Sequence, residues 1–417
     1  MGQTITQKIL QRASEEGNAR VDNVVIARAS AVMISEALGP KFFSDRFAAL
    51  GKPVFDPDRV VCVIDHYSPS ATIWQADLNR FTIDWFRKHG GKNLFVNCGP
   101  NPQVMAEKGF FLPGTLVVGN DSHTCTGGAF GALAVGIGST ATAVAAATGK
   151  VWIRVPNTVK VVLQGRAPDR VFAKDVALHL LGRFGSTGML YKAIEFEGAY
   201  IAELPMDERM VLSNLSVEMG AKAGIIAPDE TTQAAVSDGR EEGEWDLRAD
   251  PDAVYEDEMV FDVSGLEPMV AMPHHVTHVR PVRGIGEVPV HQAFIGSCTG
   301  GRYSDLKTAA EMLKGKKIHP DVRLIVTPAS KWIWERAARE GILTVLSEAG
   351  AVVMNPSCGP CGGAQGGLIG EGEVCIAASN RNFKGRMGST GAEVYLGSSA
   401  TVAASAILGK ITDPRTI

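Results

Sequence analysis

The chain of 417 residues is 45% hydrophobic and 21% charged, which predicts a soluble globular protein with a large core and about two to four domains. Its formal net charge is −4 and it has no arginine or lysine block, which excludes nucleic-acid binding through a basic surface. The first residues form no apolar run, so no secretory signal is predicted.

The first predicted elements are an N-terminal helix and a series of short strands. Thr4 and Gln7 form a capping box just before an apolar pair of residues, which predicts the start of a helix. Runs of β-branched residues then predict four strands, at 60–64, 116–118, 158–163 and 322–326. Helix-length segments separate these strands, so we expect an α/β layered fold.

Polar residues follow the first two predicted strands immediately. The first strand ends at Asp65-His66 and the second is followed by Asp121-Ser122-His123. Open α/β sheets place their sites at such strand ends, and a carboxylate beside an imidazole orients the ring and raises its basicity. A single Asp-His pair is usually a structural hydrogen bond, but two pairs in this position indicate a site.

The segment 124–149 carries no charged residue and is long enough to span a membrane. It is rich in glycine, serine and threonine and follows directly on polar residues, so we expect a buried helix with close backbone packing instead. Within it, Gly136-Ile137-Gly138 matches a dinucleotide-binding fingerprint only loosely. The residues before Gly136 are predicted to be helical, and we interpret these glycines as helix packing.

The chain has seven cysteines, an odd number that favours a reduced, cytoplasmic compartment over a disulfide framework. Cys298 lies in a Gly-Ser-Cys-Thr segment, and Cys358 and Cys361 form a CxxC motif followed by two glycines. A CxxC motif alone fits a redox dithiol, half of a zinc site or two cluster ligands. Three thiolates would leave one metal position open for chemistry. Cys62 and Cys375 lie in apolar strands and are interpreted as core thiols.

A further polar group follows the apolar run that ends near residue 378. Asn380, Arg381 and Arg386 lie within seven residues of one another, and arginine forks bind carboxylates through two hydrogen bonds. The alternative interpretation is a surface loop, but the position after a strand again favours a site.

Taken together, these motifs resemble those of the aconitase superfamily, and within it the large subunits of the 3-isopropylmalate dehydratase and homoaconitase group. The matching segments occur in the family's order and extend over nearly the whole chain: Val118 to Thr124, Gly296 to Thr299, Cys358 to Gly362 and Ser379 to Arg386. The resemblance implies three α/β/α layered domains around a central cluster, without the family's swivelling domain. The expected boundaries are 1–150, with the Asp-His motifs, 151–280, and 281–417, with the cysteines.

The resemblance implies a [4Fe-4S] cluster held by Cys298, Cys358 and Cys361, whose fourth iron acts as a Lewis acid on the substrate. The implied reaction is the dehydration and isomerisation of a hydroxy di- or tricarboxylic acid. Acid–base work is implied for five residues: Asp65, His66, Asp121, His123 and Glu218. Substrate contacts are implied for Ser122, Arg381 and Arg386. Contacts around the cluster are implied for Asn214 and Asn380.

Two positions depart from the family pattern. Pro102 stands where the family usually has a histidine, and Gly300 stands where it usually has an asparagine after the Cys-Thr pair. Both departures indicate a divergent branch, so homoaconitate and dimethylmalate are kept as alternative substrates beside 3-isopropylmalate.

The resemblance also implies a partner. In the family a serine base lies on the swivelling domain, which two-subunit members carry on a separate small protein, and too little chain follows Cys361 to form it. A heterodimer or heterotetramer with such a small subunit is therefore expected. Two other classes stay open: a non-catalytic iron–sulfur regulator and a CxxC redox protein, in which Cys298 would be dispensable.

Overall fold

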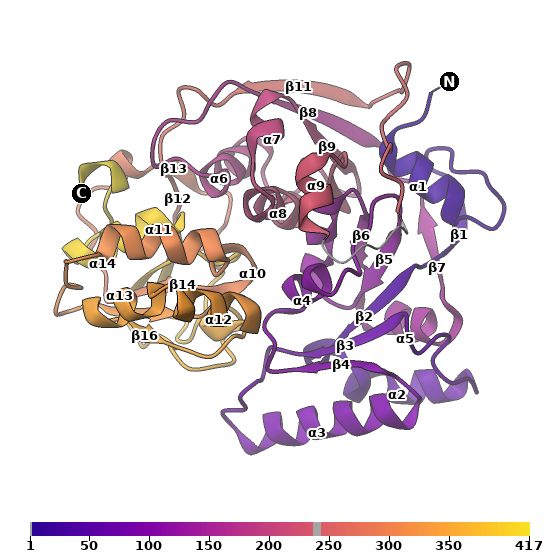
Figure 1. Ribbon diagram of the computed structural model, residues 1–417, viewed down its shortest axis with the longest axis horizontal. Coiled ribbons are helices and arrows are strands. Elements are labelled where there is room, and N and C mark those ends of the chain that lie inside the picture. The colour runs from indigo at the N-terminus through magenta and orange to yellow at the C-terminus, as the bar shows by residue number, and fades with distance from the viewer. Residues whose placement is uncertain (1, 237–242) are drawn as a thin grey trace.

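The computed structural model describes residues 2–236 and 243–417. Three sheets with their covering helices make up most of the fold (Figure 1). The α/β class predicted from the sequence is confirmed, and so are the N-terminal helix α1 (Ile5–Ala13), with its Thr4 capping box, and the four predicted strands. Among the helices described, none combines the length and the apolar character needed to cross a bilayer.

The first sheet has five parallel strands in the order β4-β3-β2-β5-β6. Its strands are β2 (Ala31–Ser35), β3 (Val60–Ile64), β4 (Asn93–Val96), β5 (Leu116–Gly119) and β6 (Leu133–Gly136). Its helices are α2 (Pro40–Ala49), α3 (Ile73–Lys88), α4 (Asn101–Glu107) and α5 (Gly138–Thr148). Every residue of β3 is buried, as expected of a parallel strand that is covered on both faces.

The second sheet has four parallel strands in the order β10-β9-β8-β11. They are β8 (Thr158–Gln164), β9 (Ala193–Glu197), β10 (Ala223–Ile226) and β11 (Asp257–Asp262). The helices are α6 (Ala173–Phe184), α7 (Ala199–Glu203), α8 (Met206–Leu215) and α9 (Glu230–Ala235). A separate antiparallel ribbon pairs β1 (Val24–Arg28) with β7 (Lys150–Arg154).

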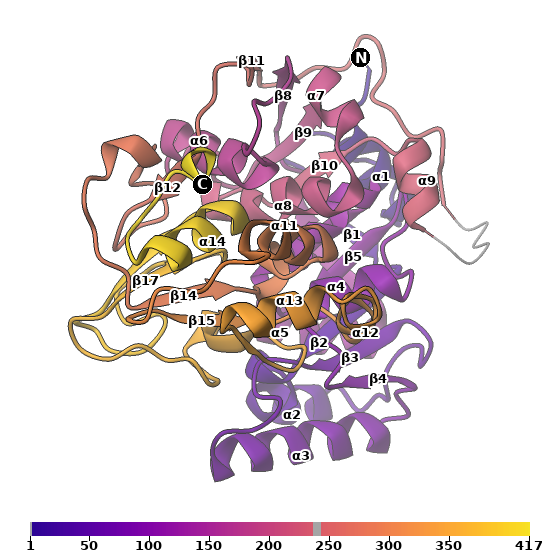
Figure 2. The ribbon, with the colours of Figure 1, turned by 60° about the vertical axis from the view of Figure 1, so that its left-hand side comes forward.

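The third sheet has seven strands in the order β13-β12-β18-β17-β14-β15-β16, with a parallel core from β18 to β16. They are β12 (Met269–Ala271), β13 (Val279–Pro281), β14 (Gln292–Ile295), β15 (Arg323–Val326), β16 (Val352–Val353), β17 (Val374–Ala377) and β18 (Glu393–Leu396). The helices are α10 (Ser297–Gly300), α11 (Tyr303–Leu313), α12 (Lys331–Arg339), α13 (Ile342–Ala349) and α14 (Ser399–Leu408). Figure 2 brings the side of the molecule with α11 to α14 forward.

Shared hydrophobic cores join the three sheets. One core combines buried residues of the second and third sheets, such as Val161 with Phe294. Another combines the first sheet with Ala223 and Ile225 of β10. The carboxyl ends of strands in different sheets are therefore held at fixed positions relative to one another, which a site built from several segments requires.

The segment 124–149 corrects one prediction. It is not one helix but the end of a 3-10 helix, η2 (Ser122–Phe130), followed by β6 and α5, so the residues before Gly136 form a strand. A run of small uncharged residues carries no periodic signal that separates these states. The close backbone packing is present, because a Cβ at Gly128 would lie 2.0 Å from the Gly224 oxygen.

Candidate active site

The predicted polar motifs converge where the carboxyl ends of the three sheets meet. β3 and β5 of the first sheet lead to Asp65 and Asp121, and β14 and β17 of the third lead to Cys298 and Asn380. The second sheet contributes Asn214 at the end of α8 and Glu218 in the short helix η3 (Ser216–Met219). Contacts across sheets connect these groups, as in the 3.7 Å approach of the Cys358 thiol to the Asp65 carboxylate, 293 residues away.

Asp65 and His66 form a tight hydrogen-bonded pair. His66 Nδ1 lies 2.8 Å from Asp65 Oδ1, and the backbone N–H of Asn101 donates to Asp65 Oδ2 at 2.6 Å. Burial lowers the pKa of His66, but the Asp65 charge and hydrogen bond oppose it most strongly. Glu36 and Asp121 act in the same direction, and the pKa of His66 rises to about 10. The ring is therefore a cation at neutral pH.

The second motif forms a chain of charged groups. His123 Nε2 lies 3.0 Å from Glu218 Oε1, to which Arg381 Nε also donates at 2.7 Å. Arg381 Nη2 donates to the hydroxyl of Ser122 at 3.0 Å. Burial raises the pKa of Asp121, but hydrogen bonds from His123 and the charge of that ring outweigh burial and hold the pKa below its usual value. Asp121 is thus an ionised carboxylate that faces His66 Nε2 at 3.6 Å.

Amide groups surround the Cys298 thiol. Asn214 Nδ2 approaches Cys298 Sγ at 3.3 Å and Asn380 Nδ2 approaches it at 3.5 Å, while the two amides bond to each other. Burial is the main cause that raises the pKa of Cys298 to about 11. A buried thiol with amide donors aimed at its sulfur suits a ligand that is deprotonated by a metal.

The CxxC motif continues from Cys358 into the short helix η5 (Gly359–Gly362). Burial raises the pKa of Cys361, but the Arg386 charge and the Ser297 hydroxyl outweigh it, so the pKa lies below its usual value. All seven cysteines are free, and Cys62 and Cys375 are fully buried in strands, as predicted for core thiols. Asp65, His66 and Cys358 also place one ligand atom each within 4.8 Å of one another.

The two arginines, Arg381 and Arg386, differ in their hydrogen-bond partners. Arg381 is committed to Glu218 and Ser122, whereas Arg386 has a buried Nε atom without a hydrogen-bond partner in the part of the chain that the structure describes. A buried guanidinium N–H is costly to leave unpaired. Of these two arginines, Arg386 is therefore the better placed to receive an anionic ligand.

Four residues that the sequence patterns did not predict belong to the same network: Ser35, Glu36, Asn101 and Gln365. Glu36, at the end of β2, is fully buried and accepts the backbone N–H groups of Asp65 and Tyr67. Burial, followed by the Asp65 charge, raises the pKa of Glu36 to about 7. The rule that polar residues follow strand ends would have found Glu36 if β2 had been predicted.

Both departures from the family pattern have a local explanation. Pro102 lies buried in the first turn of α4, where a missing N–H costs no helical hydrogen bond, and its neighbour Asn101 reaches both Asp65 and Asp121. A Cβ on Gly300 would lie 2.3 Å from the Ala378 Cβ. The contact between α10 and the end of β17 thus leaves no space for a side chain at 300.

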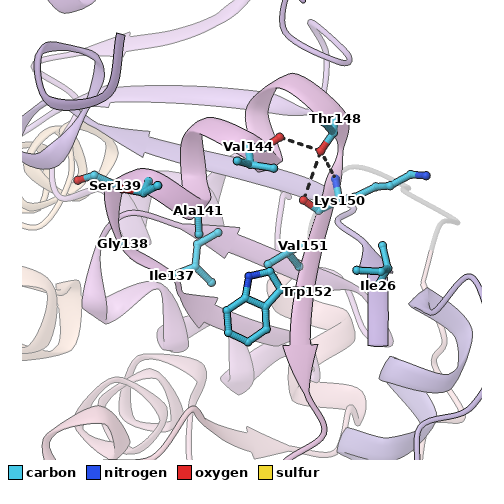
Figure 3. Close-up of a pocket in the computed structure, with 11 residues that line it drawn as sticks. Ile26, Ile137, Gly138, Ser139, Ala141, Val144, Thr148, Lys150, Val151 and Trp152 are labelled. Carbon is cyan, nitrogen blue, oxygen red and sulfur yellow. Dashed lines mark hydrogen bonds between the residues drawn. The ribbon is translucent and has the colours of Figure 1, made fainter. Parts of the chain in front are cut away.

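A roomy groove of about 550 Å³ lies elsewhere, between α5 and the β1–β7 ribbon (Figure 3). Its walls include Ile26, Val144 and Trp152, and its one charged lining residue, Lys150, is paired with Glu15. Apart from Lys150, no residue that lines the groove has a titratable side chain, so the groove lacks the clustered acids, imidazoles and thiols found at the junction of the sheets.

Comparisons with known proteins identify the family of the chain. The model of the aconitase family (aconitate hydratase) matches residues 7–286 and 283–409. The 3-isopropylmalate dehydratase large subunit 1 of Methanopyrus kandleri is 46% identical over 100% of this chain and 99% of its own length. The probable methanogen homoaconitase large subunit of Methanothermobacter thermautotrophicus is 43% identical over 99% of this chain and 97% of its own.

Among solved structures, the holo-form of Thermococcus kodakaraensis aconitase X aligns with a TM-score of 0.51. It is 14% identical, and the alignment covers 86% of this chain and 84% of that chain. At this identity the likeness concerns the fold alone.

Proposed function

The chain belongs to the aconitase family, and on that basis we propose that it is the large, catalytic subunit of a 3-isopropylmalate dehydratase. This enzyme is a hydro-lyase of leucine biosynthesis. The observation that carries the proposal is the convergence at one place of three cysteines, an arginine with a free buried N–H and two acid–imidazole pairs. Relatives that match the full chain bear the same name.

Cys298, Cys358 and Cys361 would hold the [4Fe-4S] cluster of the family. The donor set fits, because thiolates are the preferred ligands of such clusters and hydrogen bonds to sulfur tune them. Asn214 and Asn380 are positioned to donate to Cys298 Sγ. When bound, the cluster supplies a Lewis-acidic iron with an open position that draws charge from a hydroxyl and a carboxylate.

The arginines would bind the carboxylates of the substrate. Arg386 offers its unpaired Nε, and Arg381 is held in a fixed orientation by Glu218, so its remaining N–H groups have a defined direction. Planar guanidinium groups favour two parallel hydrogen bonds to a carboxylate. Glu218 thus orients Arg381 but accepts only from its Nε, so other N–H groups of the guanidinium remain for a substrate carboxylate.

His66 would donate the proton that converts the departing hydroxyl into water. Its raised pKa keeps the ring protonated at neutral pH, and Asp65 fixes its orientation through Nδ1. Nε2 then points toward Asp121, which can balance the charge of the ring. The base that removes the carbon proton is assigned to the small-subunit partner, as the family resemblance implies.

A reconstitution assay tests this function. The chain, co-purified anaerobically with its small subunit, is expected to carry a [4Fe-4S] absorbance band and to turn over 3-isopropylmalate. The panel also contains the homoaconitase substrate and a dimethylmalate. A higher kcat/KM on either of these acids would make that acid the assigned substrate in place of 3-isopropylmalate. If an enzyme with a full cluster turned over none of the acids, the assignment as a hydro-lyase would be refuted.

A pair of cysteine variants separates this function from a CxxC redox protein. Cys298→Ala is expected to abolish cluster binding and turnover, because Cys298 is a ligand. Cys375→Ala, which removes a thiol that is also buried but lies inside β17, is expected to keep both. Iron and acid-labile sulfide content measure the outcome, and normal function in Cys298→Ala would favour the redox protein.

A further inference from the structure

Lys174 is a buried lysine that no motif singled out. It lies in the first turn of α6 and its side chain enters the junction of the sheets, with only 4% of the residue exposed. Its Nζ donates to the Ser379 carbonyl at 2.6 Å and to the Ala378 carbonyl at 3.3 Å, and it lies 3.5 Å from Thr299 Oγ1. All three partners are neutral oxygens.

The charge of Lys174 has no direct counter-ion. Among the residues that the structure describes, no carboxylate lies within ion-pair distance of its ammonium group. The nearby Asp305 carboxylate is instead engaged by the Ser399 hydroxyl and the backbone N–H of Arg302. Burying a cation without a paired anion is strongly unfavourable, so an anion is required close by.

The partners of Lys174 belong to two segments that carry the proposed cluster contacts, α10 and the loop after β17. Thr299 follows Cys298, and Ser379 precedes Asn380, whose amide approaches the Cys298 sulfur. Thr299 Oγ1 also donates a hydrogen bond to the Ala378 carbonyl at 3.0 Å. The Lys174 ammonium group thus contacts both α10 and the loop after β17. Burial lowers the pKa of Lys174 to about 8, while negative charge on Asp305, Cys298 and Cys361 opposes that shift.

We propose that Lys174 is a counter-charge of the iron–sulfur centre and the positioning residue that ties α10 to the loop after β17. The inference rests on the proposed function, because three thiolates outnumber the positive charge of the cluster core and add negative charge beside Lys174 to that of Asp305. Reduction adds a further negative charge to the cluster. A fixed cation beside it therefore favours the reduced state and raises the midpoint potential.

The test is a dithionite titration of the anaerobic holoenzyme, followed by electron paramagnetic resonance, in Lys174→Met and Lys174→Gln. Both variants are expected to shift the cluster midpoint to more negative potential, Gln included, although its amide can still donate a hydrogen bond. Lys222→Met is the matched control, because that part-buried ammonium group lies 4.5 Å from the Tyr191 ring and faces no cysteine. Its midpoint is expected to equal that of the wild type.

The outcomes are distinguishable. An unchanged midpoint in a fully loaded Lys174→Gln would overturn the inference, as would an equal shift in Lys222→Met. If both neutral variants fail to fold, Lys174→Arg keeps the charge and must keep the midpoint, so a shifted midpoint there would also overturn it. A wild-type chain that binds no cluster would instead refute the proposed function.

Discussion

At the scale of single residues, His66 shows how neighbours set the chemistry of a group. Its Nδ1 lies 2.8 Å from Asp65 and 3.2 Å from the Ser35 hydroxyl, and its side chain keeps 24% of its surface exposed. The carboxylates keep the ring protonated at neutral pH, so that it holds the proton it would donate, and part of the side chain remains open to a ligand. A proton donor must hold its proton and be within reach of the group that receives it.

His66→Gln is expected to lower kcat by about 10²- to 10⁴-fold, the usual contribution of a general acid, with the cluster content unchanged. Steady-state kinetics of the reconstituted enzyme measure the loss. His319→Gln, which alters a histidine in a surface loop of the third sheet, serves as the control and should keep wild-type kinetics. Wild-type turnover in His66→Gln would remove the histidine from the proton path.

Glu195 provides a pH-dependent test away from the site. This buried carboxyl in β9 accepts hydrogen bonds from the Thr6 N–H and the Tyr255 hydroxyl, and burial raises its pKa from 4.5 to about 7. A raised pKa means that its stabilising contribution is complete below pH 4.5 and is lost as the pH rises through about 7. A glutamine at this position does not ionise, so the Glu195→Gln variant does not lose this stability as the pH rises.

The variant Glu195→Gln is therefore expected to gain stability relative to the wild type as the pH rises from 4.5 to about 7. The relative gain is up to about 3 kcal/mol, from 1.36 kcal/mol per pKa unit. Thermal unfolding at pH 5 and pH 8 measures it. A difference that stays constant over this range would show that Glu195 titrates normally in the folded chain.

At the scale of elements, the contact between α10 and the end of β17 places Cys298 beside Asn380. Gly300 allows it, since an added Cβ would lie 2.3 Å from the Ala378 Cβ and 2.5 Å from the Ala378 oxygen. That oxygen already accepts a hydrogen bond from the Thr299 hydroxyl. A side chain at position 300 would therefore displace the Ala378 carbonyl, through which α10 contacts the loop after β17.

Gly300→Ala is expected to destabilise the chain by about 1–3 kcal/mol, the usual cost of overpacking, and to lower its iron content. Gly284→Ala is the matched control, because a Cβ there meets no atom within 4 Å. Thermal unfolding and iron analysis compare the two variants. Equal midpoints and equal iron contents would show that α10 can shift without cost.

The sequence predicted strands well where burial on both faces imposes an uninterrupted apolar run, as in β3. It failed at 124–149, where small residues suit a 3-10 helix, a strand and a helix equally and only tertiary packing decides. The Asp-His, cysteine and arginine motifs could be found because each is local in sequence, whereas Asn214 and Glu218 were implied only by the family resemblance. The link from Arg381 to Glu218 spans 163 residues, and the environment of Lys174 comes from two distant loops, so neither was visible in one sequence.

At the scale of the whole molecule, the site lies where three sheets with shared cores meet, and its proposed ligands and contacts come from all three. A cluster bound there would connect the first sheet to the third through Asp65 and Cys358. A ligand that binds only the folded state stabilises it in proportion to the binding free energy. The holoenzyme should thus resist unfolding better than the chain without iron.

Removal of iron with a chelator is expected to lower the thermal midpoint of the holoenzyme by several degrees. Calorimetry before and after treatment measures the fall. The Cys298→Ala chain should keep its midpoint through the same treatment, because it has no cluster to lose. A holoenzyme whose midpoint is unaffected by the loss of iron would show that the sheets hold their arrangement without it.

The order in which the site residues leave the ribosome follows from their positions in the chain. Glu36, Asp65 and Asp121 belong to the first sheet, which can fold while synthesis continues, since domains generally fold as units from the N-terminus. Asn380 and Arg386 are synthesised only after all of these residues. Iron and sulfide can therefore meet a complete site only once Arg386 has emerged, and a chain truncated before Asn380 would lack part of the surroundings of Cys298.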